Sequence, residues 1–223
     1  PFMRILIAGS SGFLGTRLTD RLRAAGHDVT RLVRRPAVQP DEATWRPGQG
    51  ELDPALVAGA GAVINLAGVG VGDKRWTAAY KSRLRSSRVD STGTIARAIK
   101  NLPEADRPRA LLQGSAVGWY GHTGDRRVTE DAPAGKGFLA DLCRVWEAAA
   151  RPAEDAGTRV VLMRTGFPLS ADGGLLKPQM LPFRLGVGGK LAGGRQWFPW
   201  IALPDWLDAV EFLLERQDIA GPV

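Results

Sequence analysis

Residues 3–15 of this chain read Met-Arg-Ile-Leu-Ile-Ala-Gly-Ser-Ser-Gly-Phe-Leu-Gly, an apolar run followed by a glycine-rich turn. Apart from Arg4, residues 3–8 are apolar and rich in isoleucine and leucine, which is typical of a short buried strand. From Phe13 to Ala25 apolar residues recur at helical spacing, and Gly26 follows as a typical helix end. A strand, a glycine-rich turn and a helix in direct succession predict the first βα unit of an α/β sheet.

The rest of the chain repeats this alternation of strands and helices. Apolar runs predict strands at 27–33, 61–66, 109–113 and 159–163, and helical spacing predicts helices at 87–99 and 138–156. A connection rich in proline, glycine and glutamine spans 36–50, and residues 220–223 resemble the start of another strand. Strands without polar alternation, separated by helices, are typical of a parallel sheet covered on both faces. The predicted fold class is therefore α/β, a Rossmann-type doubly wound parallel sheet.

Length and composition are those of one large globular domain, with or without a smaller subdomain. The chain has 223 residues, of which 44% are apolar and 24% charged, and these values exclude a disordered or fibrous protein. The single cysteine, Cys143, excludes an intramolecular disulfide and fits a reducing compartment. The longest apolar stretch, 59–72, is too short to span a bilayer, and the chain begins in a strand-like segment without a leader pattern. We expect a cytoplasmic protein with no membrane partner.

The net charge of +7 raises the question of a nucleic-acid partner. Nucleic-acid grooves gather their cations on one face, usually with stacking aromatic residues between them, whereas here the arginines are spread along the whole chain. The densest run, from Lys74 to Arg88, fits a solvated helix face, a site for an anionic cofactor or, less well, a nucleic-acid patch. We expect no nucleic-acid partner, and phosphate chemistry stays open.

The glycine-rich turn has the spacing G-x-x-G-x-x-G between a strand and a helix. Its first glycine permits the tight turn, the second lets a pyrophosphate approach the backbone, and the third lets the helix pack on the strand. Free N–H groups at the helix start would face the phosphates. A merely tight turn is the alternative, but the context favours a dinucleotide site. The predicted cofactor contacts in this loop are Gly9, Ser10, Ser11, Gly12, Phe13, Leu14 and Gly15.

The end of the second strand indicates which dinucleotide binds. A site that prefers NAD carries an acidic residue about 20 residues after the glycine loop. This chain has Val33-Arg34-Arg35 there, and a guanidinium can hold a 2′-phosphate with paired hydrogen bonds. Two arginines that are simply exposed at a strand end are the alternative interpretation. We predict NADP(H) as the cofactor.

Together these segments resemble the extended or atypical branch of the short-chain dehydrogenase/reductase superfamily. The glycine loop matches that branch, and three further segments match it, at 65–68, 89–94 and 115–121. A closer resemblance, spread over the whole chain, is to an NADP-binding epimerase-like subfamily, sometimes labelled sugar-nucleotide epimerase or cell division inhibitor. It rests on Arg75-Trp76, 87–89, 146–150, 164–166 and 194–201.

This resemblance implies a set of residues and a domain division. Residues 1–165 would form the NADP-binding Rossmann domain, with a cleft loop at 116–137. Residues 166–223 would supply segments of a small C-terminal substrate lobe plus a returning strand and helix. Because members of the subfamily continue well beyond the position of Val223, we expect that lobe to be incomplete here. The implied cofactor contacts outside the glycine loop are Arg34, Arg35, Leu66, Ala67, Gly68, Arg88, Gly114, Gly166 and Pro168.

The catalytic residues of the superfamily are only partly present. Its oxidoreductases use Tyr-x-x-x-Lys, but Leu84 follows Tyr80 at that spacing and Gly124 follows Tyr120. Extended members place a hydroxyl residue four positions before the Tyr-Gly pair, where this chain has Ala116, with Ser115 one residue earlier. Tyr120 and Ser115 are the remaining catalytic candidates, and a tyrosine packed into the cleft wall is the alternative for the first.

Other reactive side chains give weaker signals. His122 follows the Tyr-Gly pair and could act as a general acid or be a mobile surface residue, and His27 fits a turn. Cys143 fits a buried apolar position. Neither histidine belongs to a cluster with metal-ligand spacing, so we predict no metal site.

Two functions remain open at this point. The first is an NADP-dependent epimerase or reductase acting on a nucleotide-sugar-like or small carbonyl substrate. The second is a catalytically silent NADP-binding sensor or scaffold, which the missing dyad favours. Because superfamily members often dimerise through two long helices, a homodimer through 87–99 and 138–156 is also expected.

Overall fold

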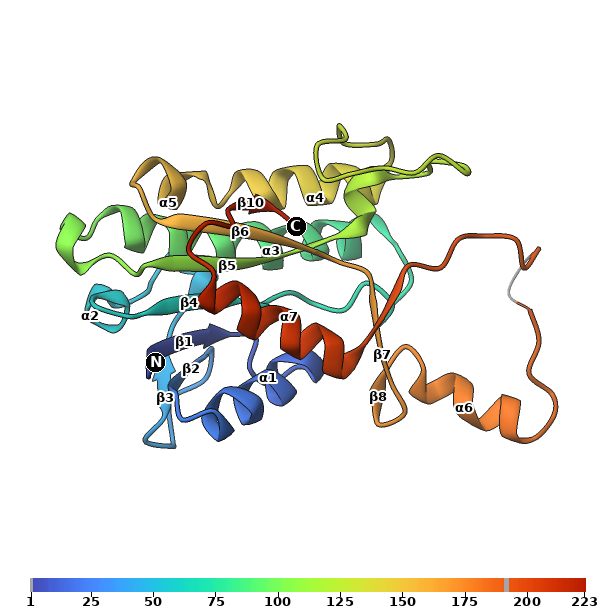
Figure 1. Cartoon of the computed structure of the whole chain (residues 1–223), viewed down its shortest axis with the longest axis horizontal. Helices are drawn as coiled ribbons and strands as arrows, with labels where there is room; N and C mark the ends of the chain where they lie inside the picture. The colour runs from blue at the N-terminus through green and yellow to red at the C-terminus, as the bar shows by residue number, and fades with distance from the viewer. Residues whose placement is uncertain (1, 191–192) are drawn as a thin grey trace.

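The computed structural model describes residues 2–190 and 193–223, and its centre is a seven-stranded sheet in which every pair of neighbours is parallel (Figure 1). The strand order is β10-β6-β5-β4-β1-β2-β3. The order reverses beside β1, which pairs with β2 on one side and β4 on the other, and such a switch point leaves a crevice at the carboxyl ends of the strands. The strands are β1 Arg4–Ala8, β2 Asp28–Val33, β3 Glu42–Thr44, β4 Ala62–Asn65, β5 Ala110–Ala116, β6 Arg159–Thr165 and β10 Gly221–Pro222.

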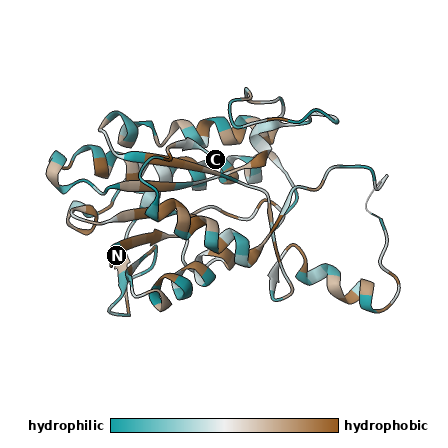
Figure 2. Ribbon diagram, viewed as in Figure 1, coloured by the Kyte–Doolittle hydropathy of each residue, from teal (hydrophilic) through white to brown (hydrophobic). Residues whose placement is uncertain are grey.

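Helices cover both faces of this sheet. Successive strand residues point to opposite sides, so an apolar strand presents apolar side chains on both faces, and both must be buried. Ile5 and Ile7 face α1 (Phe13–Ala24) and α7 (Leu203–Glu215) in one core cluster. Leu6 faces α2 (Pro54–Val57), α3 (Ala78–Lys100) and α5 (Arg151–Asp155) in the other. Strands are largely hydrophobic and helices mixed in Figure 2, which fits a sheet buried on both sides. The predicted doubly wound α/β fold is confirmed.

Two predicted elements are wrong in their bounds. Helix α3 begins at Ala78 rather than at residue 87, because Thr77 caps it by accepting a hydrogen bond from the Tyr80 N–H at 3.1 Å. The helix predicted over 138–156 is two helices, α4 (Phe138–Ala148) and α5, since Pro152 can start a helix but cannot continue one.

The connection predicted over 36–50 also holds regular structure. It contains strand β3 and a 3₁₀ turn, η1 (Pro47–Gln49), where we predicted only a linker. Two further 3₁₀ turns, η2 (Glu104–Asp106) and η3 (Val117–Tyr120), flank β5. Three residues of β3 are too few to show a period in the sequence.

After β6 the chain leaves the sheet and forms a projecting part that we call the arm, residues 167–190 and 193–202 (Figure 1). It contains β7 (Phe167–Ser170), β8 (Gly173–Gly174), α6 (Lys177–Arg184) and β9 (Trp200–Ala202), and its strands form a small sheet in the order β8-β7-β9. The chain then returns through α7 to β10, which pairs with β6. The domain boundary at residue 165 stays a prediction.

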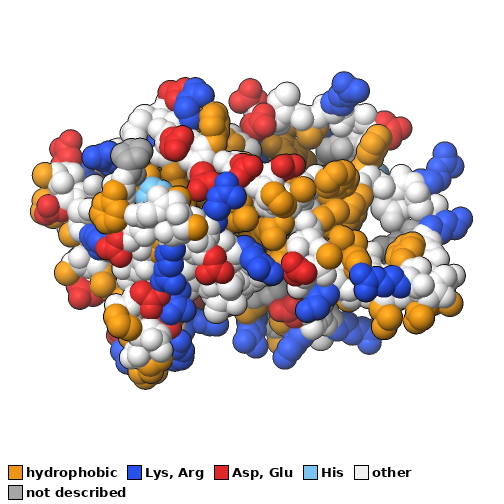
Figure 3. All heavy atoms as spheres, turned by 60° about the horizontal axis from the view of Figure 1, so that its bottom comes forward, with side chains coloured by type: hydrophobic (Ala, Val, Ile, Leu, Met, Phe, Trp, Pro, Cys, Tyr) orange, Lys and Arg blue, Asp and Glu red, His pale blue; other side chains and the backbone are white. Residues whose placement is uncertain are grey.

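Apolar side chains also reach the surface, where Figure 3 shows hydrophobic groups gathered across one face. An apolar pocket of about 410 Å³ lies between α7 and β6, with Met163, Trp206 and Phe212 among its lining residues. Within the described residues, no helix combines the length and apolarity that crossing a membrane requires.

Candidate functional site

The glycine-rich loop stands at the carboxyl end of β1, beside the switch point. Gly9 has φ 82°, and a Cβ there would lie 2.5 Å from the backbone carbon of Leu66. A Cβ on Gly15 would lie 2.1 Å from the Gly9 carbonyl oxygen. Gly12 differs from both, because its φ is −77° and a Cβ there would meet only the Gly9 oxygen, at 3.4 Å. Backbone packing within the protein therefore requires glycine at positions 9 and 15. Packing does not require it at position 12, where the absence of a side chain leaves the backbone open to a ligand.

The start of α1 offers unpaired backbone donors to that space. Gly12 is the N-terminal cap residue and supplies no side-chain hydrogen bond, and the first turn holds no acidic residue. The first N–H groups of a helix have no partner within it and carry a partial positive charge. This end of α1 is therefore suited to an anionic group such as a phosphate.

A cleft of about 900 Å³ opens in front of the loop, and we call it the cofactor cleft. It brings together predicted contacts from three segments of the chain, which are 9–12, 34–35 and 66–68. Its lining residues are Gly9, Ser10, Ser11, Gly12, residues 31–35, residues 45–49, residues 66–70, Asp73, Arg83, Ser86, Ser87, Asp90 and Ser91. Predicted contacts outside that lining are Phe13, Leu14, Gly15, Arg88, Gly114, Gly166 and Pro168.

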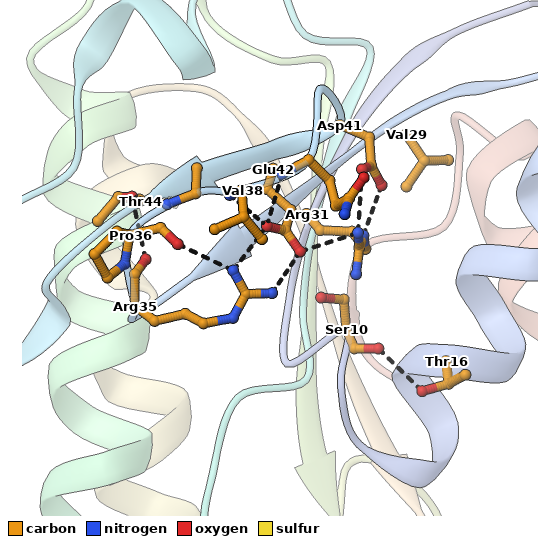
Figure 4. A network of polar contacts seen from close by, with 12 residues as sticks. Ser10, Thr16, Val29, Arg31, Arg35, Pro36, Val38, Asp41, Glu42 and Thr44 are labelled. Atoms are coloured by element: carbon orange, nitrogen blue, oxygen red, sulfur yellow. Dashed lines mark hydrogen bonds and ion pairs between the residues drawn. The ribbon is translucent and has the colours of Figure 1, made fainter.

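Arg34 and Arg35, which directly follow β2, have different surroundings, and Figure 4 shows the contacts of Arg35 with Glu42. Arg35 donates two hydrogen bonds to the Glu42 carboxylate, at 2.8 and 2.6 Å, and Arg31 lies 3.0 Å from the same group. The hydrogen bonds from Arg35, together with those from the backbone N–H groups of Val38 and Gln39, lower the pKa of Glu42 to about 2. Asp41 pairs with Arg31 in turn. The Arg34 side chain is exposed at the cleft and forms no hydrogen bond or ion pair with the described residues, so of these two arginines it is the one whose charge is left for a ligand.

Arg88 lies behind the cleft wall rather than in it. Its guanidinium donates to the carbonyl oxygens of Val69, at 3.1 Å, and Leu84, at 3.2 Å, and lies 4.9 Å from the centre of the Trp146 ring. A Cβ on Gly68 would stand 3.2 Å from its central carbon. Burial lowers the pKa of Arg88, and it forms no ion pair with the described residues. Its predicted contact with the cofactor stays a prediction.

The two catalytic candidates belong to one polar network, in which Ser115 is buried and Tyr120 is partly buried. Ser115 donates to Glu147 at 2.6 Å, and Arg164 holds the same carboxylate through Nε at 2.8 Å and Nη2 at 2.9 Å. Arg164 also donates to the Tyr120 hydroxyl at 3.1 Å, and its guanidinium lies 4.0 Å from the centre of the Trp119 ring. We call Ser115, Tyr120, Glu147 and Arg164 the Glu147 network. We did not predict Glu147 or Arg164 as partners, although an arginine directly after an apolar strand was a signal for a buried acidic partner.

The three weaker candidates, His27, His122 and Cys143, lie in different environments. His27 accepts a hydrogen bond from the Met3 backbone N–H at 3.2 Å, and His122 is exposed. Cys143 is buried, and burial raises its pKa to about 11. No three histidine, cysteine or acidic side chains among the described residues stand close enough to share a metal ion.

Three predicted cofactor contacts take part in packing. A Cβ on Gly114 would lie 3.0 Å from the Asn65 carbonyl oxygen, and one on Gly166 would lie 2.4 Å from the Pro199 carbonyl oxygen. Pro168 lies in β7 and pairs with Ile201 of β9. Glycine at the first two positions is thus explained by close backbone approach, and contact with a cofactor stays a prediction for all three.

Comparisons with known proteins agree with this architecture. Epimerase family protein Mb2239 of Mycobacterium bovis is 45% identical over 219 residues, which are 98% of this chain and 71% of the relative. Epimerase family protein SDR39U1 of Bos taurus is 38% identical over 222 residues, 98% of this chain and 72% of the relative.

Two solved structures share the fold and more than a third of the aligned residues. A crystal structure of human SDR39U1 (isoform 2) with NADPH has a TM-score of 0.87 and 35% identity, and it covers 99% of this chain and 73% of its own. The nucleoside-diphosphate sugar epimerase of Corynebacterium glutamicum has a TM-score of 0.85 and 36% identity, over 100% of this chain and 46% of its own.

A family model supplies the assignment. The model described as NAD dependent epimerase/dehydratase family matches residues 5–222, nearly the whole chain, and the predicted resemblance is confirmed. Its match runs from the first strand of the sheet to the last, through the glycine-rich loop, the Glu147 network and the arm. The chain therefore belongs to the NAD dependent epimerase/dehydratase family.

Proposed function

We propose that this chain binds NADPH in the cofactor cleft and that Arg34 recognises the adenosine 2′-phosphate. The observation that carries the proposal is the unequal state of two neighbouring arginines. Arg35 is neutralised by Glu42, whereas Arg34 stands at the cleft without an acidic partner among the described residues. An exposed guanidinium can form two parallel hydrogen bonds with a phosphate. The relative crystallised with NADPH supports the same cofactor.

The residues of the cleft fit the remaining parts of this cofactor. The pyrophosphate would lie against Gly12, where the backbone is open, and against the uncapped N-terminus of α1. The adenosine side would run along Leu66 and Ala67, which line the cleft. When bound, NADPH supplies hydride at its nicotinamide ring.

We further propose an epimerase or reductase type of reaction on a nucleotide-sugar-like or small carbonyl substrate. Support comes from the family and from a relative described as a nucleoside-diphosphate sugar epimerase. Within the chain, Tyr120 is the proton donor that the geometry allows. Because Arg164 can only donate, the Tyr120 hydroxyl accepts from it and keeps its own proton for another acceptor.

A silent NADPH-binding protein is the second candidate, and the Glu147 network favours it. Ser115 already donates its proton to Glu147, so its hydroxyl is engaged within the protein. Turnover of Tyr120→Phe separates the two functions once a substrate is found. A catalytic Tyr120 predicts a loss of at least about tenfold in kcat with little change in NADPH affinity. Unchanged turnover would exclude Tyr120 as the acid.

The experiment that tests the cofactor proposal is a side-by-side fluorescence titration with NADPH and NADH. We expect the wild type to bind NADPH at least about tenfold more tightly, because only NADPH carries the 2′-phosphate. Arg34→Ala should remove most of that preference. Arg35→Ala is the matched control and should keep it, since Arg35 is occupied by Glu42. Equal binding of both dinucleotides by the wild type would contradict the role of Arg34.

A further inference from the structure

An aromatic ring of the glycine-rich loop lies against the backbone of the arm. Phe13 is the first residue of α1 and directly follows Gly12. A Cβ on Gly173 would lie 2.5 Å from Cδ2 and 2.6 Å from Cε2 of the Phe13 ring, and one on Gly174 would lie 2.9 Å from Cε1. The β7–β8 hairpin lies off the N-terminal end of α1 in Figure 1, in agreement with these distances. The hairpin is therefore seated on the ring with no space for a side chain.

Gly173 is glycine because of this ring rather than because of its backbone. Gly174 has φ 63° and favours glycine on conformation alone, but Gly173 lies outside the left-handed region. A second contact joins the same two segments, since Arg17 of α1 lies 3.7 Å from Asp172 of the hairpin. Both side chains of that pair are exposed, so the ring supplies most of the contact.

The β7–β8 hairpin is joined to both ends of the arm through strand β7. Strand β7 pairs antiparallel with β8, where Leu169 faces Gly174, and parallel with β9, where Leu169 faces Ala202. Because β9 closes the far end of the arm, a displacement at Gly173 would move β7 and with it both ends of the arm. The loop that would hold the pyrophosphate and the arm therefore share one packing contact.

We propose that Phe13 is a positioning residue that couples NADPH binding at the glycine-rich loop to the placement of the arm. The inference rests on the proposed function. A cofactor that fixes the backbone at Gly12 also fixes the ring that follows it, and a fixed ring holds the hairpin. Such coupling is reciprocal, so disturbing the hairpin must weaken NADPH binding by the same factor by which NADPH steadies the hairpin.

The first experiment measures the NADPH dissociation constant of glycine variants of the arm. Gly173→Ala forces a methyl group into the Phe13 ring and should weaken binding by about fivefold or more. Gly189→Ala is the matched control, because a Cβ there meets nothing within 4 Å and its φ is unexceptional. We expect its affinity to stay within about twofold of the wild type.

The coupling also predicts compensation between the two sides of the contact. Phe13→Leu leaves a gap and should weaken binding alone, whereas Phe13→Leu combined with Gly173→Ala fills that gap and should recover much of the affinity. Purely additive losses in this double-mutant cycle would overturn the proposal. Thermal unfolding of each variant shows whether a loss comes from the fold, and the double variant keeps the test valid if Gly173→Ala is unstable.

A second readout follows the arm directly. Trypsin can cut after Arg184 and Arg195, which are exposed in the arm. We expect NADPH to slow these cuts about fivefold in the wild type and in Gly189→Ala, and to protect Gly173→Ala far less. Equal protection of Gly173→Ala would mean that NADPH holds the arm by another route, which overturns the role of Phe13 alone. A wild type that binds no NADPH would contradict the proposed function as well.

Discussion

The cofactor cleft and the Glu147 network are both built from polar groups, but they are satisfied in opposite ways. At the cleft, the start of α1 has no side-chain cap, and Arg34 pairs with none of the described residues. In the Glu147 network every functional side chain is held by another, and the Glu147 carboxylate receives three hydrogen bonds from Ser115 and Arg164. The cleft leaves the start of α1 and the charge of Arg34 available to a ligand, whereas the network uses its charged groups within the protein.

The difference indicates which part of the molecule is prepared for binding and which part holds the fold together. Buried polar groups without partners are costly, so unpaired donors persist where a ligand or water can reach them. A buried ion pair with all its hydrogen bonds made instead fixes the segments that contribute to it. The Glu147 network ties η3, α4 and β6 together at the end of the sheet.

Among the changes considered, removing Glu147 should have the largest effect on the stability of the fold. Glu147→Ala leaves the Arg164 charge buried without its partner, and we expect the free energy of unfolding to fall by about 3–5 kcal/mol. The matched control is Asp141→Ala on the same helix, whose pair with Arg144 is about half exposed. That control should cost less than about 1 kcal/mol.

Urea unfolding followed by tryptophan fluorescence measures both variants. A loss of less than about 1 kcal/mol for Glu147→Ala would show that the network is no tighter than a surface pair. The buried position of Arg164 and Glu147, whose side chains are only 4% and 6% exposed, would then need another explanation.

A substitution at Gly12 of the glycine-rich loop should have the opposite effect, because it should lower NADPH affinity and leave the stability of the fold unchanged. Gly12→Ala meets only one atom, at 3.4 Å, so we expect normal stability with an NADPH affinity lowered by about a hundredfold. Gly15→Ala would bring its Cβ to 2.1 Å from the Gly9 oxygen and should destabilise the fold itself. Thermal unfolding and NADPH titration of both variants check this separation. Normal NADPH binding by Gly12→Ala would place the phosphates elsewhere.

Lowering the pH should have a smaller effect on stability, through the protonation of Glu42 beside the cofactor cleft. Glu42 has a folded-state pKa of about 2, below its ordinary value of 4.5, because Arg35 and two backbone N–H groups hold its ionised form. The stability that this carboxylate contributes is therefore complete above pH 4.5 and is lost as the pH falls toward about 2. Glu42→Gln cannot show that loss.

Urea midpoints at about pH 5 and about pH 3 provide the measurement. The wild type should lose more stability between the two than Glu42→Gln does. Asp41, whose pKa is also well below its usual range, is present in both proteins and cancels in the difference. Equal losses would show that Glu42 is not held by Arg35 in solution.

The glycine-rich loop could be predicted from the sequence because its signal is local, with strand, turn and helix adjacent in the chain. The network could not, since Ser115 and Glu147 are 32 residues apart and Glu147 and Arg164 are 17 apart. The parallel pairing of β5 with β6 places Ser115 beside Arg164, and α4 brings Glu147 to both of them. The pairing of Arg35, but not Arg34, with an acidic residue could not be predicted either, because Glu42 belongs to a strand too short to be recognised in the sequence.

The exposed position of Arg34 also bears on how the preference for NADPH responds to ionic strength. Salt screens a charge at the protein surface over about 8 Å under physiological conditions, and it screens buried pairs much less. The discrimination between the two dinucleotides should therefore be greatest in dilute buffer and narrow as salt is added. A protein of this charge, +7 overall, would also meet its anionic ligand faster in dilute buffer.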